Sequence, residues 1–386
     1  MNFSLSEEQT LIQQSAKRIG ESELAPLAEK LDQQGDRSAF LNNLKILAEN
    51  GFMGVNINEQ YGGTNADTIS FSLALTELGR ACASTAVTTS VTNMVAEVIQ
   101  SVGNEAQRSR YLPKLCSGDY AAGGFCLTES GAGSDPSAMR CSAEKTNDGW
   151  EINGAKQYIT SAEFAGVFVV WAVTDKSASK GKGISCFLVE ANNPGLSISK
   201  AEKKMGQHGS ATNEVVFDKC LVNDAALLGE LNKGFKIAVG ELAGGRIGVG
   251  SLALGIGLAA IDYARAYTKE RQQFGQAIAN FQGLQWMLAD TYTELEAAKL
   301  LLLQAAYLKD QGLPFGKAAS MAKVFSTEAA NKACYTALQL MGGAGYLSEY
   351  PLERYARDAR ITTIYEGTSE IQRVIIAREL LSEIVS

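Results

Sequence analysis

The spacing of apolar residues changes twice along the chain, and these two changes constrain the fold more than any other feature. In the first 120 residues apolar side chains recur at helical spacing, as between Leu11 and Ile19. From Ala121 onward the apolar segments are short or alternating, and turn dipeptides such as Asp148-Gly149 separate them. From about Gly234 long segments rich in alanine and leucine return. A chain with this order is expected to place a sheet between two sets of helices.

These changes predict an α+β fold of three domains. They are an N-terminal helical domain over residues 1–120, a middle antiparallel β domain over residues 121–230 and a C-terminal four-helix bundle over residues 231–386. Ser6 followed by Gln9 predicts a capping box at the start of the first helix. C-terminal helices are predicted over residues 253–268, 281–311, 316–341 and 369–381. Strands are predicted over residues 123–128, 139–145, 166–173, 184–189 and 213–217.

Charge and composition argue against several classes of function. The net charge of −7 argues against a nucleic-acid-binding protein, because the chain has no basic excess to neutralise phosphates. The N-terminus lacks the basic and apolar regions of a secretory signal. The longest apolar run, residues 247–261, is 15 residues long. A bilayer requires about 20 residues, so we expect no membrane insertion.

The cysteines and the single histidine narrow the chemistry further. Seven cysteines are scattered without a CxxC pair, which is typical of reduced thiols in a cytoplasmic protein. His208 is the only histidine, so neither a His-based metal site nor a Ser-His-Asp triad is expected. We interpret His208 as a structural or peripheral residue, and we expect no bound metal.

A glycine pattern typical of dinucleotide binding, GxGxxA, occurs at residues 248–253 and again at residues 255–260. That fingerprint requires a strand before it and an acidic residue about 20 positions later. The preceding residues, 241–246, do not have the pattern of a strand. We therefore interpret the small residues as a surface for close packing between helices.

Five segments carry side chains or glycines that suit ligand binding. Residues 125–135 end a strand in a glycine-containing turn, whose amides and hydroxyls suit anions or heterocycle edges. Residues 156–161 place an aromatic ring and a hydroxyl at a strand end, and residues 269–276 contain an arginine that suits a diphosphate. Residues 339–346 form a glycine-rich helix end, and residues 357–373 contain an acidic loop. Taken singly, the first segment is as readily an ordinary turn, and the fourth also matches a helix cap. For the other three, a half-buried strand, a solvated helix end or a surface loop is the commoner outcome.

Glu366 lies in the last of these segments, just before a predicted helix. Ser369 and Gln372 match a capping box, so the helix is predicted to begin at Ser369. Glu366 then occupies the preceding loop, next to the flexible Gly367. A carboxylate in this position could act as a base, although an exposed loop glutamate is the commoner outcome.

In their order, the five segments resemble the acyl-CoA dehydrogenase family over essentially the whole chain from about Ser6. The most specific motifs are LTESGAGSD at residues 127–135 and IYEGTSEIQR at residues 364–373. The resemblance implies a bound FAD, held by the middle domain and the C-terminal bundle. On the flavin side it implies contacts from Phe125, Leu127, Thr128, Gly133, Ser134, Tyr158, Ile159, Thr160, Thr368, Ser369 and Glu370.

The resemblance also implies that a neighbouring subunit completes the FAD site. In this family a second subunit holds the adenine and diphosphate end, here through Arg271, Phe274, Phe281, Gln282, Gln339, Leu340, Gly342 and Gly343. A shared site implies at least a dimer, and the family implies a homotetramer built as a dimer of dimers. The family's contacts with acyl-CoA correspond here to Ser134, Phe235, Ala243, Arg246 and Gly367. Ala243 replaces an acidic residue that is common in relatives.

The implied reaction is the α,β-dehydrogenation of an acyl-CoA to a trans-2-enoyl-CoA. Glu366 would take the α-proton while flavin N5 takes the β-hydride, and an electron-transfer flavoprotein would accept the electrons. The backbone N–H of Glu366 and a ribityl hydroxyl would polarise the thioester carbonyl. Exclusion of water would raise the pKa of Glu366 and strengthen it as a base.

Some branches of the family carry the base on a bundle helix, immediately before the arginine that corresponds to Arg246. Gly245 occupies that position here, so no carboxylate competes with Glu366 there. The overall pattern is most like the short-chain and branched-chain members. A non-oxidising lyase and a silent binding protein are the alternatives, and the retained base and flavin motifs argue against both. The acyl chain length stays open, because it depends on how residues 87–98 and 242–249 pack.

Overall fold

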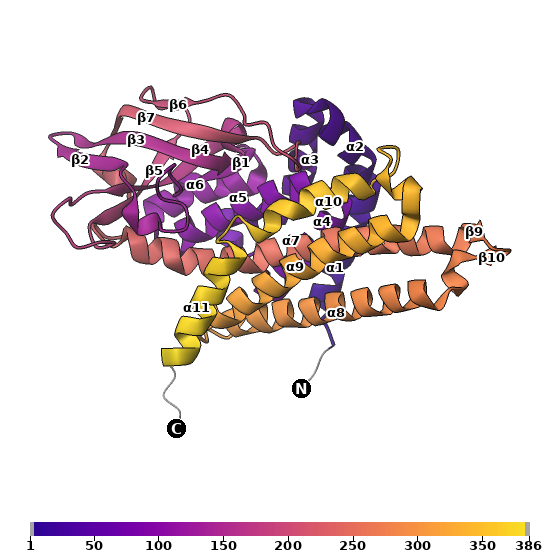
Figure 1. The fold of residues 1–386 in the computed structure, drawn as a ribbon. Helices are drawn as coiled ribbons and strands as arrows, with labels where there is room; N and C mark the ends of the chain where they lie inside the picture. Colours follow the sequence, from indigo (N-terminus) through magenta and orange to yellow (C-terminus); the bar gives the residue numbers. More distant parts are fainter. Residues whose placement is uncertain (1–3, 383–386) are drawn as a thin grey trace.

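The computed structural model describes residues 4–382, and its N-terminal part is helical (Figure 1). The predicted capping box at Ser6 is confirmed. Its Oγ accepts a hydrogen bond from the Gln9 N–H at 3.1 Å, and Gln9 Oε1 accepts one from the Ser6 N–H at 2.9 Å. The helices are α1 (Glu7–Ile19), α2 (Ala25–Gln34), α3 (Arg37–Glu49), α4 (Thr68–Ala81), α5 (Ala83–Val102) and α6 (Glu105–Ser117).

The middle of the chain forms an eight-stranded sheet. Its strands are β1 (Ala122–Cys126), β2 (Ser142–Thr146), β3 (Gly149–Thr160), β4 (Ala165–Val173), β5 (Ile184–Glu190), β6 (Leu196–Ile198), β7 (Thr212–Val222) and β8 (Leu227–Leu228). The order is β6-β7-β3-β2-β4-β5-β8, with β1 beside β4. The antiparallel prediction is confirmed for most pairs, but β4 pairs parallel with β1 and, at one residue pair, with β2. The β2–β3 hairpin lies between β1 and β4 in sequence, which gives the chain the length that a parallel connection requires.

The longest helix of the described chain, α7 (Gly234–Glu270), runs for 37 residues through the middle of the molecule (Figure 1). The predicted start at residue 253 is therefore wrong. The helical pattern before that residue was not recognised, because its glycines have low helix propensity. These small residues are packing positions. A Cβ at Gly255 would lie 2.2 Å from the Thr76 carbonyl oxygen of α4, and one at Gly250 would lie 2.6 Å from Leu302 Cδ2. The interpretation of GxGxxA as a close-packing surface is confirmed.

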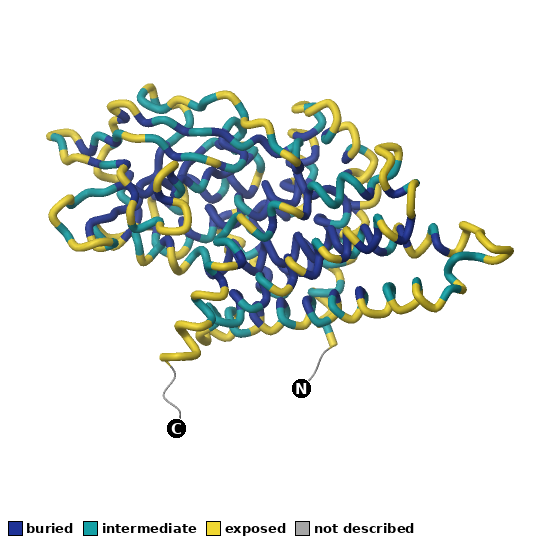
Figure 2. The backbone as a smooth tube through the Cα atoms, in the orientation of Figure 1, coloured by how far each residue is buried: buried dark blue, intermediate teal, exposed yellow. Residues whose placement is uncertain are grey.

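The remaining helices pack around α7. A short hairpin, β9 (Gln272–Gln273) and β10 (Gln276–Ala277), leads into α8 (Gln282–Asp310), α9 (Gly316–Met341), α10 (Leu352–Arg360) and α11 (Ser369–Ser382). Among the helices within residues 4–382, only α7 is long and apolar enough to span a bilayer, and 78% of that apolar window is buried inside the protein. Figure 2 shows the buried backbone concentrated along the middle of the molecule, where a core helix belongs.

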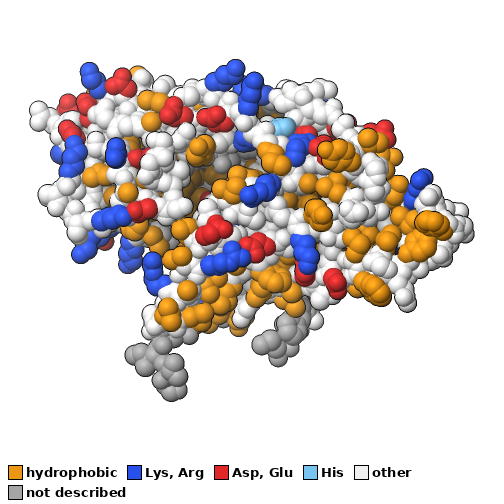
Figure 3. All heavy atoms as spheres, viewed as in Figure 1, with side chains coloured by type: hydrophobic (Ala, Val, Ile, Leu, Met, Phe, Trp, Pro, Cys, Tyr) orange, Lys and Arg blue, Asp and Glu red, His pale blue; other side chains and the backbone are white. Residues whose placement is uncertain are grey.

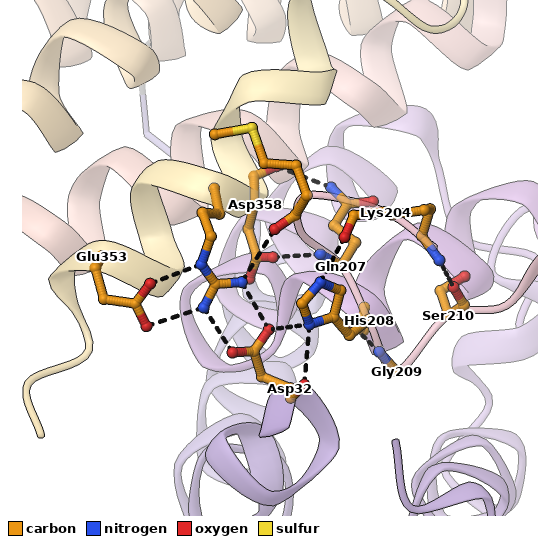
Figure 4. Close-up of polar contacts among 11 residues, drawn as sticks. Asp32, Lys204, Gln207, His208, Gly209, Ser210, Glu353 and Asp358 are labelled. Carbon is orange, nitrogen blue, oxygen red and sulfur yellow. Dashed lines mark hydrogen bonds and ion pairs between the residues drawn. The ribbon is translucent and has the colours of Figure 1, made fainter. Parts of the chain in front are cut away.

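A polar cluster joins α2, α10 and the loop before β7 (Figure 4). The Nδ1 atom of His208 lies 3.0 Å from an Asp32 carboxylate oxygen, and its Nε2 lies 2.8 Å from the Lys204 carbonyl oxygen. The Arg357 guanidinium binds the Asp32 carboxylate at 2.6 Å and also the Glu353 carboxylate. The expected structural role of His208 agrees with this position between segments that are distant in the sequence.

Candidate active site

Glu366 lies on a sharp backbone turn between a short 3-10 helix (Ile361–Thr363) and α11. Its φ is +54° and that of Gly367 is +90°, so both residues are in the left-handed region. The Glu366 residue is only partly exposed, and its Oε2 atom is shielded from solvent with no hydrogen-bond partner in the described chain. A buried carboxylate oxygen without a partner is uncommon and is typical of a functional site.

The carboxylate of Glu366 lies beside Gly245 of α7, a position that Met94 of α5 also borders. A Cβ built on Gly245 of α7 would lie 3.1 Å from Glu366 Oε2 and 2.8 Å from the Met94 sulfur of α5. Glycine at position 245 therefore leaves the room that the carboxylate occupies. Gly245 is the position that the resemblance assigns to the alternative base, and it lies directly beside Glu366.

Two cations partly offset the effect of burial on the pKa of Glu366. Burial raises the pKa of its carboxyl to about 7, and the charges of Arg246 and Lys323 act in the opposite direction. Arg246 is itself buried on α7, where its Nη1 lies 3.3 Å from Ser320 Oγ. Lys323 reaches the turn from α9, and its Nζ donates to the Gly367 carbonyl oxygen at 2.8 Å. A carboxyl with a pKa near neutrality can both take and release a proton at physiological pH.

Four of the buried polar atoms that have no partner in the described chain gather around this turn. They are Arg246 Nε, Glu366 Oε2, Ser369 Oγ and Gln372 Oε1. Orphaned donors and acceptors in one place indicate a site that a polar ligand completes.

The predicted cap of α11 is wrong by one residue. The helix begins at Ser369 as predicted, but Thr368 Oγ1 accepts the capping hydrogen bond, from the Ile371 N–H at 3.3 Å. The amide of Gln372, assigned to the cap from the sequence, donates instead to the carbonyl oxygens of Glu366 and Gly367. Thr368 and Ser369 are both competent caps, and Gln372 forms the alternative hydrogen bonds because its side chain is buried beneath the turn.

The two segments of the middle domain that are predicted to contact the flavin lie side by side. The Gln157 N–H donates to the Thr128 carbonyl oxygen at 2.8 Å, and the buried Lys156 donates to the Leu127 carbonyl oxygen at 3.1 Å. Lys156 also pairs with the Glu129 carboxylate at 2.8 Å. Leu127 and Thr128 are thereby brought next to residues 156 and 157, which directly precede Tyr158, Ile159 and Thr160. Phe125, Gly133 and Ser134 lie close to Leu127 and Thr128 in the sequence.

Residues 125–134 and 158–160, here called the ledge, fit a flat heterocycle such as that of FAD. The Tyr158 ring is exposed, on a residue whose φ is +59°. A Cβ at Gly131 or Gly133 would meet no atom within 4 Å, so the space on that side of the turn is open to a ligand. The exposed ring, this open turn and the orphaned polar atoms around Glu366 are the groups that a flavin and its ribityl chain would use.

The residues predicted for the adenine and diphosphate end are not beside this ledge. Arg271, Phe274, Phe281 and Gln282 belong to the β9–β10 hairpin and the start of α8, at the end of the molecule away from the sheet (Figure 1). Phe274 is 92% exposed at the tip. Gln339 and Leu340 end α9, and the exposed Gly342 and Gly343 follow. One chain alone therefore does not bring the hairpin to the flavin segments.

The residues predicted to contact acyl-CoA lie along α7 and the loop after β1. Phe235 and Arg246 share one stripe of α7, and Ala243 lies near them, buried. A Cβ at Gly181 would lie 3.4 Å from the Phe235 ring and 3.7 Å from Ser137 Cβ, so the loop that holds Ser134 comes close to Phe235. Gly367 lies near this stripe, because the neighbouring Glu366 is beside Gly245 of α7.

Sequence reasoning missed Lys323 and Met94. Both are buried residues of long helices, and neither lies in a motif that pointed to chemistry. One feature of the sequence could have indicated Lys323: it lies among small residues on one helix face, and a charge buried there requires a partner. Met94 carried no signal, because an apolar residue on a helix is most often core.

Known proteins with similar sequences and structures identify the fold. Profiles of the acyl-CoA dehydrogenase N-terminal, middle and C-terminal domains match residues 6–119, 124–220 and 232–381. The acryloyl-CoA reductase (NADH) of Anaerotignum propionicum is 44% identical, over 99% of this chain and 96% of its own. Butyryl-CoA dehydrogenase from Megasphaera elsdenii matches with a TM-score of 0.95 at 40% identity, covering 99% of this chain and 100% of that chain. A chain solved in work on the electron transferring flavoprotein of Acidaminococcus fermentans matches with a TM-score of 0.96 at 42% identity, covering 99% and 100%.

Proposed function

The chain belongs to the acyl-CoA dehydrogenase family and is therefore an FAD-dependent oxidoreductase, and we propose that Glu366 is its catalytic base. It would remove the α-proton of a short-chain or branched-chain acyl-CoA. The observation that carries this proposal is the state of the carboxylate: Oε2 is shielded, has no partner in the described chain and lies beside Gly245.

The residues around Glu366 fit the removal of a weakly acidic proton. Burial raises the pKa of Glu366 to about 7, so its ionised form is a stronger base than an exposed carboxylate. Within the described chain no group accepts a hydrogen bond from the Glu366 backbone N–H, which leaves it free for the thioester carbonyl oxygen. Bound FAD would accept the hydride from the β-carbon, which is the redox part of the reaction.

We propose that the ledge of residues 125–134 and 158–160, with Thr368, Ser369 and Glu370, holds the flavin. Acyl-CoA would lie along the α7 stripe that starts at Phe235, passes Ala243 and ends at Arg246. The exposed Val239 and the partly exposed Leu242 lie on the same stripe and would give it an apolar surface. Ser134 and Gly367 would border this path at its two sides.

A homotetramer, built as a dimer of dimers, is the proposed assembly. Large apolar side chains are exposed on the C-terminal helices, with Trp286 of α8 at 64% and Tyr335 of α9 at 71%. Figure 3 shows hydrophobic side chains gathered at the β9–β10 end, where Phe274 lies. Exposed aromatic residues of this kind favour association with another copy. The separation of the hairpin from the flavin ledge of its own chain supports an FAD site completed by a second subunit.

An electron-transfer flavoprotein is the proposed electron acceptor, because a chain 42% identical was solved in work on such a flavoprotein. The cytoplasm is the proposed compartment, since all seven cysteines are free and buried. The lyase alternative is not favoured, because the butyryl-CoA dehydrogenase matched above is an oxidising enzyme and the carboxylate for proton removal is retained.

We expect the purified holoenzyme to be yellow and to lose that colour when butyryl-CoA is added anaerobically. Hydride transfer reduces the flavin, and the visible absorbance reports it. A panel of straight and branched acyl-CoAs, followed by stopped-flow absorbance, would define the preferred chain. Crotonyl-CoA is the control, because it is already unsaturated and has no hydride to give. Stable colour with every saturated thioester would contradict the proposal, and rapid reoxidation by oxygen alone would indicate an oxidase.

Substituting Gly245 by valine is expected to slow flavin reduction by about 100-fold. The new Cβ would lie 3.1 Å from Glu366 Oε2 and 2.8 Å from the Met94 sulfur, so the two methyl groups must displace the base. The matched control is Gly240→Val on the same helix, where a Cβ meets nothing within 4 Å. Both variants gain the same β-branched residue, so only the clash differs. Equal rates in the two variants would show that Gly245 does not border the reacting carboxylate.

A further inference from the structure

The backbone turn at Glu366 has a conformation that glutamate rarely adopts. Its φ of +54° is in the left-handed region, where a Cβ crowds the following carbonyl oxygen. Gly367, with φ +90°, continues the turn and is the one residue of the pair that tolerates such a backbone. A non-glycine residue persists in this region only where surrounding groups hold it. The groups that hold this turn therefore control where the carboxylate points.

Two side chains from outside the turn bind its two carbonyl groups. Gln372 Nε2 donates to the Glu366 carbonyl oxygen at 3.1 Å and to the Gly367 carbonyl oxygen at 2.9 Å. Lys323 Nζ donates to the Gly367 carbonyl oxygen at 2.8 Å. Both side chains are fully buried, and a Cβ at Gly367 would lie 2.7 Å from Gln372 Nε2. The amide and the ammonium thus enclose the turn from α11 and α9.

A lysine in this place does more than a neutral donor would do. A glutamine could supply one hydrogen bond to a carbonyl group, whereas a buried ammonium is disfavoured by desolvation, which lowers the pKa of Lys323 to about 8. The compensating partner is Glu366, whose negative charge is the largest of the effects that favour the charged form of Lys323. The ammonium is therefore arranged to stabilise the ionised base.

Charged groups of α7, α9 and α11 interact electrostatically with Glu366 or with Lys323. Arg246 of α7 stabilises the ionised form of Glu366. On the same helix, burial raises the pKa of the Glu241 carboxyl, and the negative charge of Glu366 adds to that rise. Lys323 of α9 acts in the same direction as Arg246. Burial raises the pKa of the neighbouring Tyr365 hydroxyl, and the charge of Glu366 raises it further. Glu370 of α11 and Glu328 of α9 act on Lys323, whose charged form they favour. Lys323 is thus one of two cations that offset the burial of the base.

We propose that Lys323 and Gln372 are positioning residues for the base, which clamp the left-handed turn and aim the Glu366 carboxylate. Lys323 has a second part in this: its charge sets the pH at which Glu366 becomes ionised. Gln372 contributes to the aim alone, because it is neutral. This inference rests on the proposed role of Glu366 as the base.

The test for Lys323 uses the pH dependence of flavin reduction in the holoenzyme. In the wild type the rate should rise with pH through about 7, because only ionised Glu366 takes a proton. Lys323→Gln keeps a donor but loses the charge, so the midpoint should move upward by about one pH unit or more. Lys323→Arg should keep the midpoint near that of the wild type. Lys332→Gln, on an exposed part of the same helix, removes an equal charge and is the matched control.

The test for Gln372 separates aim from charge. Gln372→Leu removes both hydrogen bonds with little change in volume and leaves every charge in place. Its rate of flavin reduction should fall by about 10- to 100-fold at all pH values, with an unchanged midpoint. Gln372→Glu, ionised or protonated, restores at most one donor and should not recover the rate.

Infrared titration of the substrate-free holoenzyme gives a readout that does not depend on turnover. The band of protonated Glu366, identified by its absence in Glu366→Gln, should persist to higher pH in Lys323→Gln than in Lys332→Gln. Unchanged midpoints and rates in the Lys323 and Gln372 variants would overturn the inference while the role of Glu366 stood. Full activity in Glu366→Gln would overturn the role of Glu366 itself. If Gln372→Leu fails to fold, the Lys323 series still decides the charge effect, and the rate of Gln372→Asn, whose shorter amide cannot span both carbonyl groups, decides the aim.

Discussion

Replacing Glu366 by glutamine is expected to slow the reduction of bound flavin by acyl-CoA by about 1,000-fold or more, with FAD still bound. An amide of the same shape cannot take a proton, and a positioned general base contributes about 10²–10⁴-fold to a rate. Gly245, which lies beside the Glu366 carboxylate, offers no carboxylate to replace it. Anaerobic stopped-flow absorbance measures the loss, and the visible spectrum of the purified variant reports its FAD content.

The control for this prediction is Glu379→Gln, an exposed glutamate on α11 that also loses one negative charge. It should reduce its flavin at the wild-type rate. Glu366→Gln should also be no less stable than the wild type, since it removes a buried carboxylate whose Oε2 has no partner in the described chain. Flavin reduction within a few-fold of the wild type in Glu366→Gln would show that the base is another residue.

The fold was largely predictable because each part of the chain has one dominant apolar period. The helices α9 and α11 were placed to within a residue, since their small and apolar residues leave no competing pattern. The start of α7 was misplaced because glycine signals a break in a local reading. At Gly250 and Gly255 the same residue type instead allows α4 and α8 to approach the helix closely. Packing between helices, which a local pattern does not encode, decided this boundary.

The motifs of the candidate site could be predicted from the sequence, but the contacts between its distant residues could not. Glu366 was singled out by the residues after it and by the order of five segments, none of which was decisive alone. The surroundings of Gly245, which both Glu366 and Met94 border, join three regions that are distant in sequence. The hydrogen bonds of Lys323 and Gln372 to the turn likewise depend on how α9 and α11 meet. Apart from the residue types, a single sequence does not show which helices pack against each other.

The ion pair of Lys156 and Glu129 leads to the second large effect, which is on stability. Lys156 is fully buried and its Nζ binds Glu129 Oε1 at 2.8 Å, while the Glu129 carboxylate also accepts the backbone N–H groups of Arg140 and Cys141. Glu129→Leu would leave a buried ammonium with one carbonyl oxygen and would orphan both N–H groups. We expect it to lower the free energy of unfolding by about 3–5 kcal/mol. We also expect weaker FAD binding, because the pair joins the two segments that are proposed to hold the flavin.

The asymmetry of this ion pair makes its test specific. Lys156→Met should be less damaging than Glu129→Leu, because the carboxylate keeps its two backbone donors, and the double variant should recover part of the loss by removing the unpaired ammonium. Urea unfolding of the holoenzyme and titration of the apoprotein with FAD measure the two effects. The exposed pair of Lys145 and Asp224 is the control, where Lys145→Met should change stability by less than about 1 kcal/mol. If Glu129→Leu were as mild as that control, the buried pair would be a passive feature of the sheet. A large loss of stability and of FAD affinity in the Glu129 variant alone would instead show that the buried ion pair stabilises the proposed flavin ledge.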